Sequence, residues 1–167
     1  MNVILCGMMG VGKSTVGLTV ARLMKRRWVD TDTVIADRYG SINDIFEYYG
    51  EGHFRALESQ ITAEFSKMED LVISTGGGLV LKWENAELLK KSGKLFFLKA
   101  SVDTLLARVQ GDDTRPLLRN VNAKEKLEQL ILERTPRYEH VSDYQIETDG
   151  KSADEVARAI VAIMEKV

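Results

Sequence analysis

The feature that most constrains this chain is a glycine-rich segment near its N-terminus, Gly7-Met8-Met9-Gly10-Val11-Gly12-Lys13-Ser14. It fits the pattern G-x-x-x-x-G-K-[ST], follows an apolar run at residues 3–6 and opens a stretch with helical periodicity. Backbone N–H groups of such a turn, together with the positive end of the following helix, bind polyphosphate. The glycines allow positive φ angles and close approach of the backbone to the phosphates. The segment therefore predicts a nucleotide-binding loop between a buried strand and a helix.

The same segment narrows the class of protein. We expect Lys13 to reach the β- and γ-phosphates of a bound nucleotide and the hydroxyl of Ser14 to hold Mg²⁺. A switch GTPase would also need a guanine-reading N-K-x-D segment, which the sequence lacks, and 167 residues leave no room for a separate motor domain. These observations favour an ATP-dependent kinase that acts on a small metabolite.

Composition argues against several kinds of partner. Lys plus Arg number 23 and Asp plus Glu number 25, so the net charge is −2 and offers no basic surface for nucleic acid or an anionic membrane. Cys6, the single cysteine, cannot form an intramolecular disulfide. No stretch is apolar for long enough to be a signal peptide or a membrane-spanning helix. We expect a cytoplasmic protein with small-molecule partners, without nucleic acid or membrane partners.

The rest of the chain alternates between short apolar runs and longer segments with helical periodicity. Strands are expected at 3–6, 27–29, 71–75, 94–99 and 144–147. Helices are expected at 13–27, up to 37, 43–49, 53–68, 83–91, 102–110, 123–134, 136–142 and 152–164, the last with Ser152 and Glu155 as a capping box. Such alternation predicts one α/β domain over residues 1–167, with a parallel sheet covered by helices on both faces and ligands beyond the carboxyl ends of the strands.

Two aspartates follow the second predicted strand. Asp30 and Asp32 are two positions apart, and in an extended segment such side chains point the same way. One could serve the metal while the other accepts a proton from a substrate hydroxyl. Alternatively, the two aspartates lie at the N-terminus of a helix, where acidic side chains are favoured.

Four further features each allow two interpretations. Arg55 could bind a ligand or be solvated, and Gly76-Gly77-Gly78 could bring backbone N–H groups to a ligand or form a loose turn. Arg115, whose extended geometry the following proline favours, could reach a ligand from a polar loop. Arg134 could do so from the end of a helix or be an ordinary helix-end charge.

Taken together, these segments resemble the shikimate kinase family over almost the full length of the chain. The residues that carry the resemblance are 7–15, 29–32, 54–55, 75–78, 114–118 and 134–138, in matching order and spacing. The resemblance implies a three-layer α/β/α P-loop kinase with a five-stranded parallel sheet, a helical substrate-binding segment at about 31–60 and a lid at about 111–122. It implies a monomer that uses ATP and Mg²⁺ to phosphorylate the 3-hydroxyl of shikimate, in aromatic amino acid biosynthesis.

The resemblance also implies roles for individual residues. Asp32 would bind shikimate and act as the base, with Lys13 and Arg115 as the other catalytic residues. The implied ATP contacts are Gly10, Val11, Gly12, Lys13, Ser14, Thr15, Arg108 and Arg115, with Arg108 beside the adenine. The implied substrate contacts are Asp32, Arg55, Gly76, Gly77, Gly78 and Arg134, of which the two arginines hold the carboxylate. Ser14 and Asp30 would hold Mg²⁺.

Two features depart from the family's pattern. Asp112 and Asp113 place negative charge in a lid that closes on polyphosphate. Arg137 stands where the family more often has an apolar residue, which adds a cation near the expected substrate pocket.

Two alternative functions stay open. A gluconate-type sugar-acid kinase also needs a P-loop and a grip on a carboxylate, but the aspartate pair, Phe54-Arg55 and the glycine triplet argue against it. A non-catalytic nucleotide-binding regulator on the same fold would be expected to lack Lys13, Asp32 or Arg115, and all three are present.

Overall fold

The central element of the fold is one parallel sheet. The structure, a computed structural model, describes residues 1–109 and 122–167. The strand order is β2-β3-β1-β4-β5, and every neighbouring pair is parallel. The strands are β1 (Asn2–Cys6), β2 (Arg27–Asp30), β3 (Leu71–Ser74), β4 (Gly93–Lys99) and β5 (Tyr144–Glu147). The predicted five-stranded parallel sheet is confirmed.

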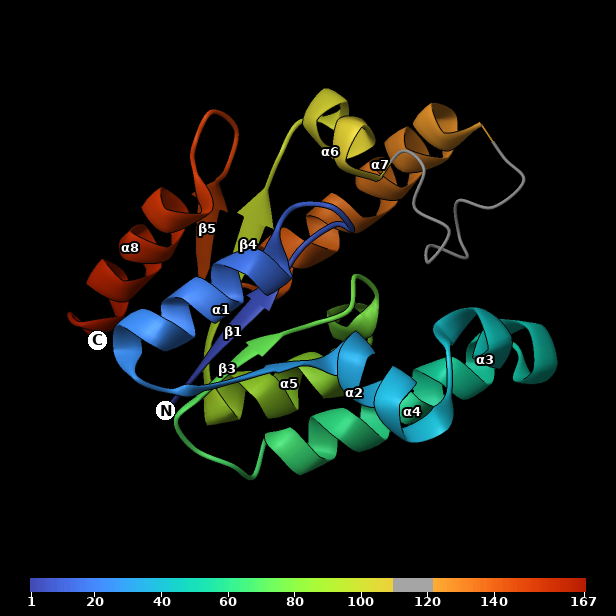
Figure 1. Cartoon of the computed structure of the whole chain (residues 1–167), viewed down its shortest axis with the longest axis horizontal. Coiled ribbons are helices and arrows are strands. Elements are labelled where there is room, and N and C mark those ends of the chain that lie inside the picture. Colours follow the sequence, from blue (N-terminus) through green and yellow to red (C-terminus); the bar gives the residue numbers. More distant parts are fainter. Residues whose placement is uncertain (110–121) are drawn as a thin grey trace.

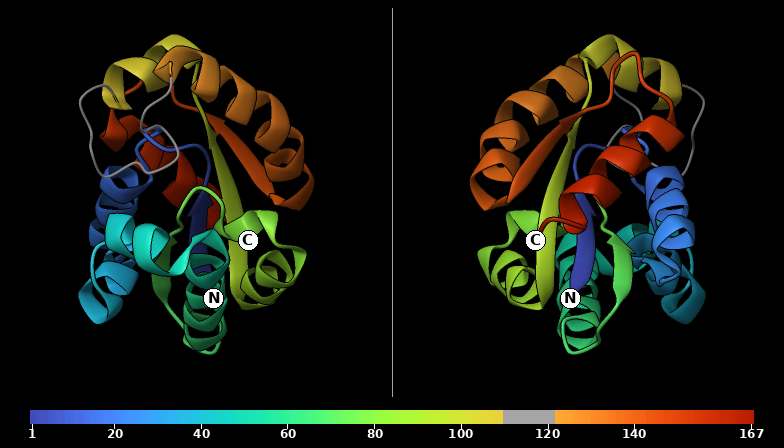
Figure 2. Two further views of the ribbon diagram at one scale, coloured as in Figure 1. Left: turned by 90° about the vertical axis from the view of Figure 1, so that its right-hand side faces the viewer. Right: turned by 90° about the vertical axis from the view of Figure 1, so that its left-hand side faces the viewer.

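Helices cover both faces of this sheet. They are α1 (Lys13–Met24), α2 (Thr31–Tyr39), α3 (Ile42–Tyr49), α4 (Glu51–Phe65), the short 3₁₀ helix η1 (Leu79–Leu81), α5 (Trp83–Ser92), α6 (Val102–Val109), α7 (Ala123–Val141) and α8 (Ala153–Met164). Figure 2 shows α1 and α8 on one face and α4, α5 and α7 on the other. This arrangement follows from right-handed crossovers, because chain movement in opposite directions along the sheet places the connecting helices on opposite faces.

The middle strand explains the apolar run that precedes the glycine-rich loop. β1 lies between β3 and β4, and all five of its residues are buried. A strand covered by helices on both faces has no solvent side, so it is continuously apolar instead of alternating. Its first residue is polar, yet Asn2 is satisfied because its amide donates to the carbonyl of Met68 at 2.8 Å and accepts from the N–H of Leu71 at 2.9 Å.

Several helix boundaries differ from the predicted ones, among them both ends of α4, which spans Glu51–Phe65 instead of 53–68. α1 ends at Met24 instead of residue 27, because Lys25 adopts a left-handed conformation (φ 55°) and Arg26 donates back to the carbonyl of Ala21 at 2.9 Å. This is a C-terminal capping turn, in which backbone N–H groups donate hydrogen bonds to the last carbonyl groups of the helix.

The two helices predicted at 123–134 and 136–142 are one continuous helix, α7, with Pro136 inside it. A proline within a helix leaves the carbonyl four residues earlier without its hydrogen bond. Here that residue is Leu132, which is 78% exposed, so water can satisfy its carbonyl. The prediction of a break was wrong because it did not consider that Pro136 lies on the solvent-facing side of the helix. The capping box of Ser152 and Glu155 at the start of α8 is confirmed.

The fold brings the expected functional segments to one edge of the sheet. The carboxyl ends of β1, β2 and β3 lead into the glycine-rich loop, Asp30 and the glycine triplet, and all three open towards α2–α4 (Figure 1). Within the two described ranges, no helix is long and apolar enough to cross a membrane.

The junction of β1 and β4 leaves no room for a side chain at Gly93. A Cβ there would lie 2.0 Å from the carbonyl oxygen of Asn2, its direct partner in β1. We expect Gly93→Ala to lower the free energy of unfolding by about 3 kcal/mol, the upper range for overpacking a core, as measured by urea denaturation.

Gly52→Ala is the matched control for this substitution. A Cβ at Gly52, in the first turn of α4, meets no heavy atom within 4 Å. This substitution should raise the free energy of unfolding by about 0.5–1 kcal/mol, because alanine loses less backbone freedom than glycine on folding. Equal unfolding midpoints for the two variants would contradict the close β1–β4 packing.

Candidate active site

The glycine-rich loop wraps closely around the ammonium group of Lys13. Lys13 is only 9% exposed, and its Nζ donates to the carbonyls of Gly7 at 2.7 Å and Met8 at 2.9 Å. Gly10 and Gly12 have φ angles of 81° and 103°, which favour glycine. The loop therefore holds the lysine where the first turn of α1 begins, as an anion site requires.

A chain of hydrogen bonds fixes that first turn to the sheet. The indole of Trp28 donates to the hydroxyl of Ser74 at 3.0 Å, and this hydroxyl donates to the carbonyl of Lys13 at 2.7 Å. Gly17 makes the contact possible, since a Cβ there would lie 2.3 Å from the Ser74 oxygen. β2, β3 and α1 are thereby joined directly below the loop.

Asp30 links the glycine-rich loop to the start of α2. One of its carboxylate oxygens accepts from the hydroxyl of Ser14, and the other accepts from the N–H groups of Asp32 at 3.0 Å and Thr33 at 3.2 Å. Asp30 is thus the N-cap of α2, as the interpretation of an acidic helix N-terminus expects. The expectation that Asp32 lies in an extended segment was wrong, because Asp32 is in the first turn of α2.

Ser14 and Asp30 fit a hard cation. Their oxygens meet beside the loop, and Mg²⁺ prefers oxygen ligands, of which the protein supplies only one or two when phosphates supply others. Within the described residues, no group of three or more His, Cys, Asp or Glu side chains could hold a metal.

Each glycine of the triplet makes room for a different charged side chain. A Cβ on Gly76 would lie 2.5 Å from Oδ1 of Asp32 and 3.0 Å from Oε2 of Glu58. A Cβ on Gly77 would lie 3.2 Å from Nη1 of Arg134, and one on Gly78 only 2.3 Å from Nη1 of Arg55. Two carboxylates and two guanidinium groups therefore converge on one stretch of backbone. The structure brings together the predicted residues Asp32, Arg55, Arg134 and the triplet.

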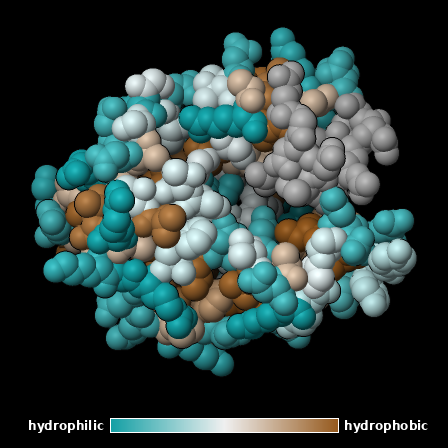
Figure 3. Space-filling model, viewed as in Figure 1, coloured by the Kyte–Doolittle hydropathy of each residue, from teal (hydrophilic) through white to brown (hydrophobic). Residues whose placement is uncertain are grey.

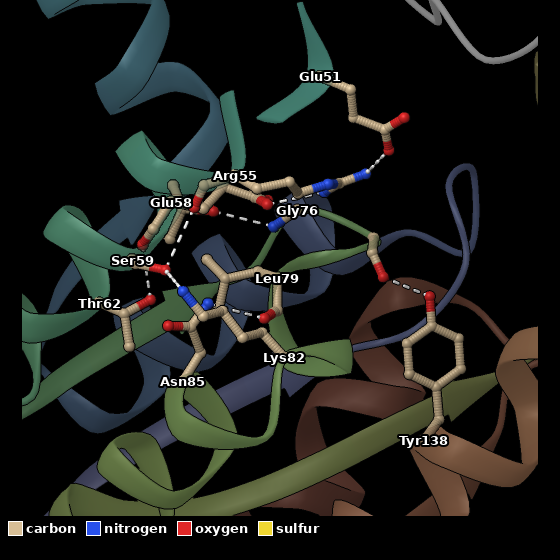
Figure 4. Close-up of polar contacts among 12 residues, drawn as sticks. Glu51, Arg55, Glu58, Ser59, Thr62, Gly76, Leu79, Lys82, Asn85 and Tyr138 are labelled. Atoms are coloured by element: carbon tan, nitrogen blue, oxygen red, sulfur yellow. Dashed lines mark hydrogen bonds and ion pairs between the residues drawn. The ribbon is translucent and has the colours of Figure 1, made fainter. Parts of the chain in front are cut away.

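Hydrogen bonds hold this stretch in place, as Figure 4 shows. The N–H of Gly76 donates to the hydroxyl of Thr31 at 2.8 Å, and the hydroxyl of Tyr138 donates to the carbonyl of Gly77 at 2.5 Å. Burial raises the pKa of Tyr138 well above its usual value, so this hydroxyl stays protonated and remains a donor. The triplet is fixed from α2 on one side and from α7 on the other.

Arg55 is held by two glutamates that the sequence reasoning missed. Its Nη1 donates to Glu58 at 2.7 Å and its Nη2 to Glu51 at 3.1 Å. Both lie on α4, three residues after and four before the arginine, so the spacing of ion pairs along a helix was the available signal. Glu58 is 1% exposed, and burial raises its pKa to about 7, although the Arg55 guanidinium pulls in the opposite direction.

The nucleotide end of the site is a cleft of about 380 Å³, visible as a hollow in Figure 3. It is lined by Gly10, Val11, Gly12, Lys13, Ser14, Thr15, Val16, Asp30, Asp32, Thr75, Gly77, Arg108, Thr148, Lys151, Ala153 and Val156. Arg108 donates to the carbonyls of Gly10 at 3.1 Å and Val11 at 2.9 Å, so it is attached to the loop itself.

The last four lining residues were also missed. Thr148 and Lys151 follow β5, and Ala153 and Val156 begin α8. The rule that ligands bind beyond the carboxyl ends of parallel strands applies to β5 as well and was the available signal.

Some predicted features lie elsewhere or outside the described residues. Arg115, Asp112 and Asp113 are in the segment 110–121, which is not described, so the lid predicted at 111–122 falls there almost entirely. Arg137 does not line the main cleft. It lies in a separate groove with Val80, Leu81, Trp83, Pro136, His140 and Val141.

Comparisons with known proteins agree with this geometry. The shikimate kinase family model matches residues 9–165. A shikimate kinase of Vibrio parahaemolyticus is 41% identical over 166 residues, which cover 99% of this chain and 96% of that relative. This chain belongs to the shikimate kinase family.

Solved structures support the same assignment. A shikimate kinase from Acinetobacter baumannii in complex with shikimate matches with a TM-score of 0.95 at 37% identity, covering 99% of this chain and 93% of that one. A gluconokinase from Sinorhizobium meliloti matches with a TM-score of 0.57 at 14% identity over 99% and 92% of the two chains, which shows the fold alone. The predicted family, fold class and enzyme class, an ATP-dependent kinase, are confirmed.

Glu58 should make the stability of this family member depend on pH. Its pKa is about 7 in the fold against an ordinary 4.5, so the folded chain binds a proton that the unfolded chain has released between these values. The resulting stabilisation is fully present below about pH 4.5 and is lost as the pH rises through 7. Relative to Glu58→Gln, the wild-type free energy of unfolding should fall by up to about 3 kcal/mol between pH 5 and 8.

Urea denaturation at several pH values measures this difference. Glu47→Gln, which changes an exposed carboxylate on α3, is the control and should show no such trend. A wild-type to Glu58→Gln difference that stays constant over the pH range would mean that Glu58 is ionised throughout.

Proposed function

We propose that this chain transfers the γ-phosphate of ATP to the 3-hydroxyl of shikimate, with Mg²⁺ bound to the nucleotide. The observation that carries the proposal is the convergence of Asp32, Arg55 and Arg134 on the glycine triplet, next to the phosphate-binding loop. A nucleotide site, a carboxylate base and two cations for a substrate carboxylate are thereby brought to one sheet edge.

The acceptor half of the site suits a hydroxy acid. Arg55 and Arg134 approach neighbouring glycines, and planar guanidinium groups pair bidentately with a carboxylate. Asp32 lies on the opposite side of the triplet from α7 and also lines the nucleotide cleft. It is therefore the residue we assign to accept the proton of the attacking hydroxyl.

The half of the site that would bind ATP, the phosphate donor, serves mainly to place positive charge around the phosphates. Lys13 and the backbone of Gly10, Val11 and Gly12 would hold the phosphates. Ser14 and Asp30 would hold Mg²⁺, which neutralises phosphate charge when bound. Thr15 and Arg108, with Lys151 as an addition to the predicted set, would complete the nucleotide contacts. Arg115 is assigned to the transferring phosphate from the sequence alone.

The organisation of the enzyme is also proposed from these features. The substrate-binding segment predicted at about 31–60 corresponds to α2, α3 and the first part of α4. The flat charge balance supports small molecules as the partners and gives no sign of nucleic acid binding. The single domain over 1–167, the monomeric state and the cytoplasmic location stay predictions.

A coupled assay of ADP release tests the proposal. The purified chain is incubated with ATP and Mg²⁺ and with shikimate, gluconate or no acceptor. Turnover is expected with shikimate alone. Turnover with gluconate alone would overturn the acceptor assignment, and tight ATP binding without turnover on either acid would favour a non-catalytic regulator.

Gly78→Ala tests the grip on the substrate carboxylate. Gly78 has φ −95° and ψ −7°, so alanine meets no left-handed strain there, and the effect comes from a methyl group 2.3 Å from Nη1 of Arg55. Displacing the guanidinium should raise KM for shikimate about tenfold, the cost of one charge-assisted hydrogen bond. KM for ATP should stay within about twofold. Steady-state kinetics beside Arg55→Ala and the control Gly52→Ala measure this, and a rise in KM for ATP alone would show that Arg55 serves the nucleotide.

A further inference from the structure

The guanidinium group of Arg55 is engaged at both ends by glutamates of its own helix, α4. Nη1 is paired with Glu58 at 2.7 Å and Nη2 with Glu51 at 3.1 Å. Two carboxylates therefore surround one cation (Figure 4). Above about pH 7, where Glu58 is ionised, a substrate carboxylate that joined them would be the third anion at a single positive charge. Like charges this close repel strongly.

The two glutamates differ in how easily they can leave. Glu58 is 1% exposed and makes the shorter contact, so its carboxylate is held inside the fold. Glu51 is 54% exposed at the first position of α4, so its carboxylate can turn into solvent and be hydrated there. An exposed pair of this kind contributes little to stability.

Arg55 itself has reasons to stay where it is. Its guanidinium lies against the backbone of Gly78, with Nη1, Cζ and Nη2 all within 2.8 Å of where a Cβ would be. Its Cζ also lies 5.3 Å from the ring centroid of Phe54, a cation–π contact. Loss of the Glu51 contact would thus leave the guanidinium positioned by Glu58, Gly78 and Phe54.

We propose that Glu51 occupies, in the free enzyme, the place on Arg55 that the substrate carboxylate takes. Substrate binding then exchanges one carboxylate for another at Nη2, while the contact with Glu58 persists. Glu51 is an internal competitor that sets the affinity for the acid, and it takes no part in phosphoryl transfer. This inference rests on the proposed function of the site.

If Glu51 competes with the substrate carboxylate, removing the charge of Glu51 should improve substrate binding. Glu51→Gln keeps the size and helical position of the side chain but weakens its contact with Arg55. KM for shikimate should fall about two- to fivefold, the range expected from an exposed ion pair. kcat and KM for ATP should not change. Glu47→Gln, an equal change of charge at an exposed position on α3, should leave all three constants at their wild-type values.

A neutral acceptor separates competition for charge from other effects. With the carboxamide analogue of shikimate, wild-type enzyme and Glu51→Gln should have the same KM, because that substrate brings no anion to Arg55. Equilibrium titration with shikimate in the absence of ATP should show the same two- to fivefold gain in affinity for Glu51→Gln.

Opposite results would overturn the exchange. An unchanged or higher KM for shikimate in Glu51→Gln would mean that Glu51 supports Arg55 in the bound state. An equal gain with the carboxamide would mean that charge is not the cause. Failure of the wild-type enzyme to turn over shikimate would instead refute the proposed function, so the two failures are distinguishable.

Discussion

The site depends above all on the close approach of charged side chains to the bare backbone of Gly76-Gly77-Gly78. The three glycines face four charged side chains, and a Cβ would lie 2.5 Å from its nearest partner at Gly76, 3.2 Å at Gly77 and 2.3 Å at Gly78. The partners come from α2 and α4, which lie before β3 in the chain, and from α7, which lies far after it. The triplet is therefore the surface on which three separate parts of the protein are aligned.

The sheet makes that alignment possible. β3 pairs with β1 in parallel, so the triplet and the glycine-rich loop emerge side by side from the same edge. Thr75, immediately before the triplet, donates its N–H and its hydroxyl to the carbonyl of Leu5, each at 3.0 Å. The distance between the nucleotide-binding half and the substrate-binding half proposed for the site is thus set by the pairing of two buried strands, which packing keeps rigid.

How much of this was predictable depends on the range of the interaction. The loop and its flanking strand and helix follow from local sequence, because the backbone itself supplies the chemistry and needs glycine at fixed positions. The triplet could be identified as important, but not which side chain faces which glycine, since that is decided by the packing of α4 and α7 against η1. The same limit applies to Glu58, whose spacing from Arg55 is local while its burial is not. Pro136 shows the reverse, a strong local signal for a break that α7 tolerates because the proline lies on its solvent-exposed side.

The hydrogen-bond chain below the loop has a practical consequence. The indole of Trp28 is joined through Ser74 to the carbonyl of Lys13, the residue that begins the helix behind the phosphates. Indole emission is sensitive to the hydrogen bond of its nitrogen and to nearby charge. The other tryptophan, Trp83, lies on the surface beside His140, within the groove that holds Arg137. The two indoles thus form a natural pair of optical probes, one coupled to the nucleotide loop and the other a reference at the protein surface.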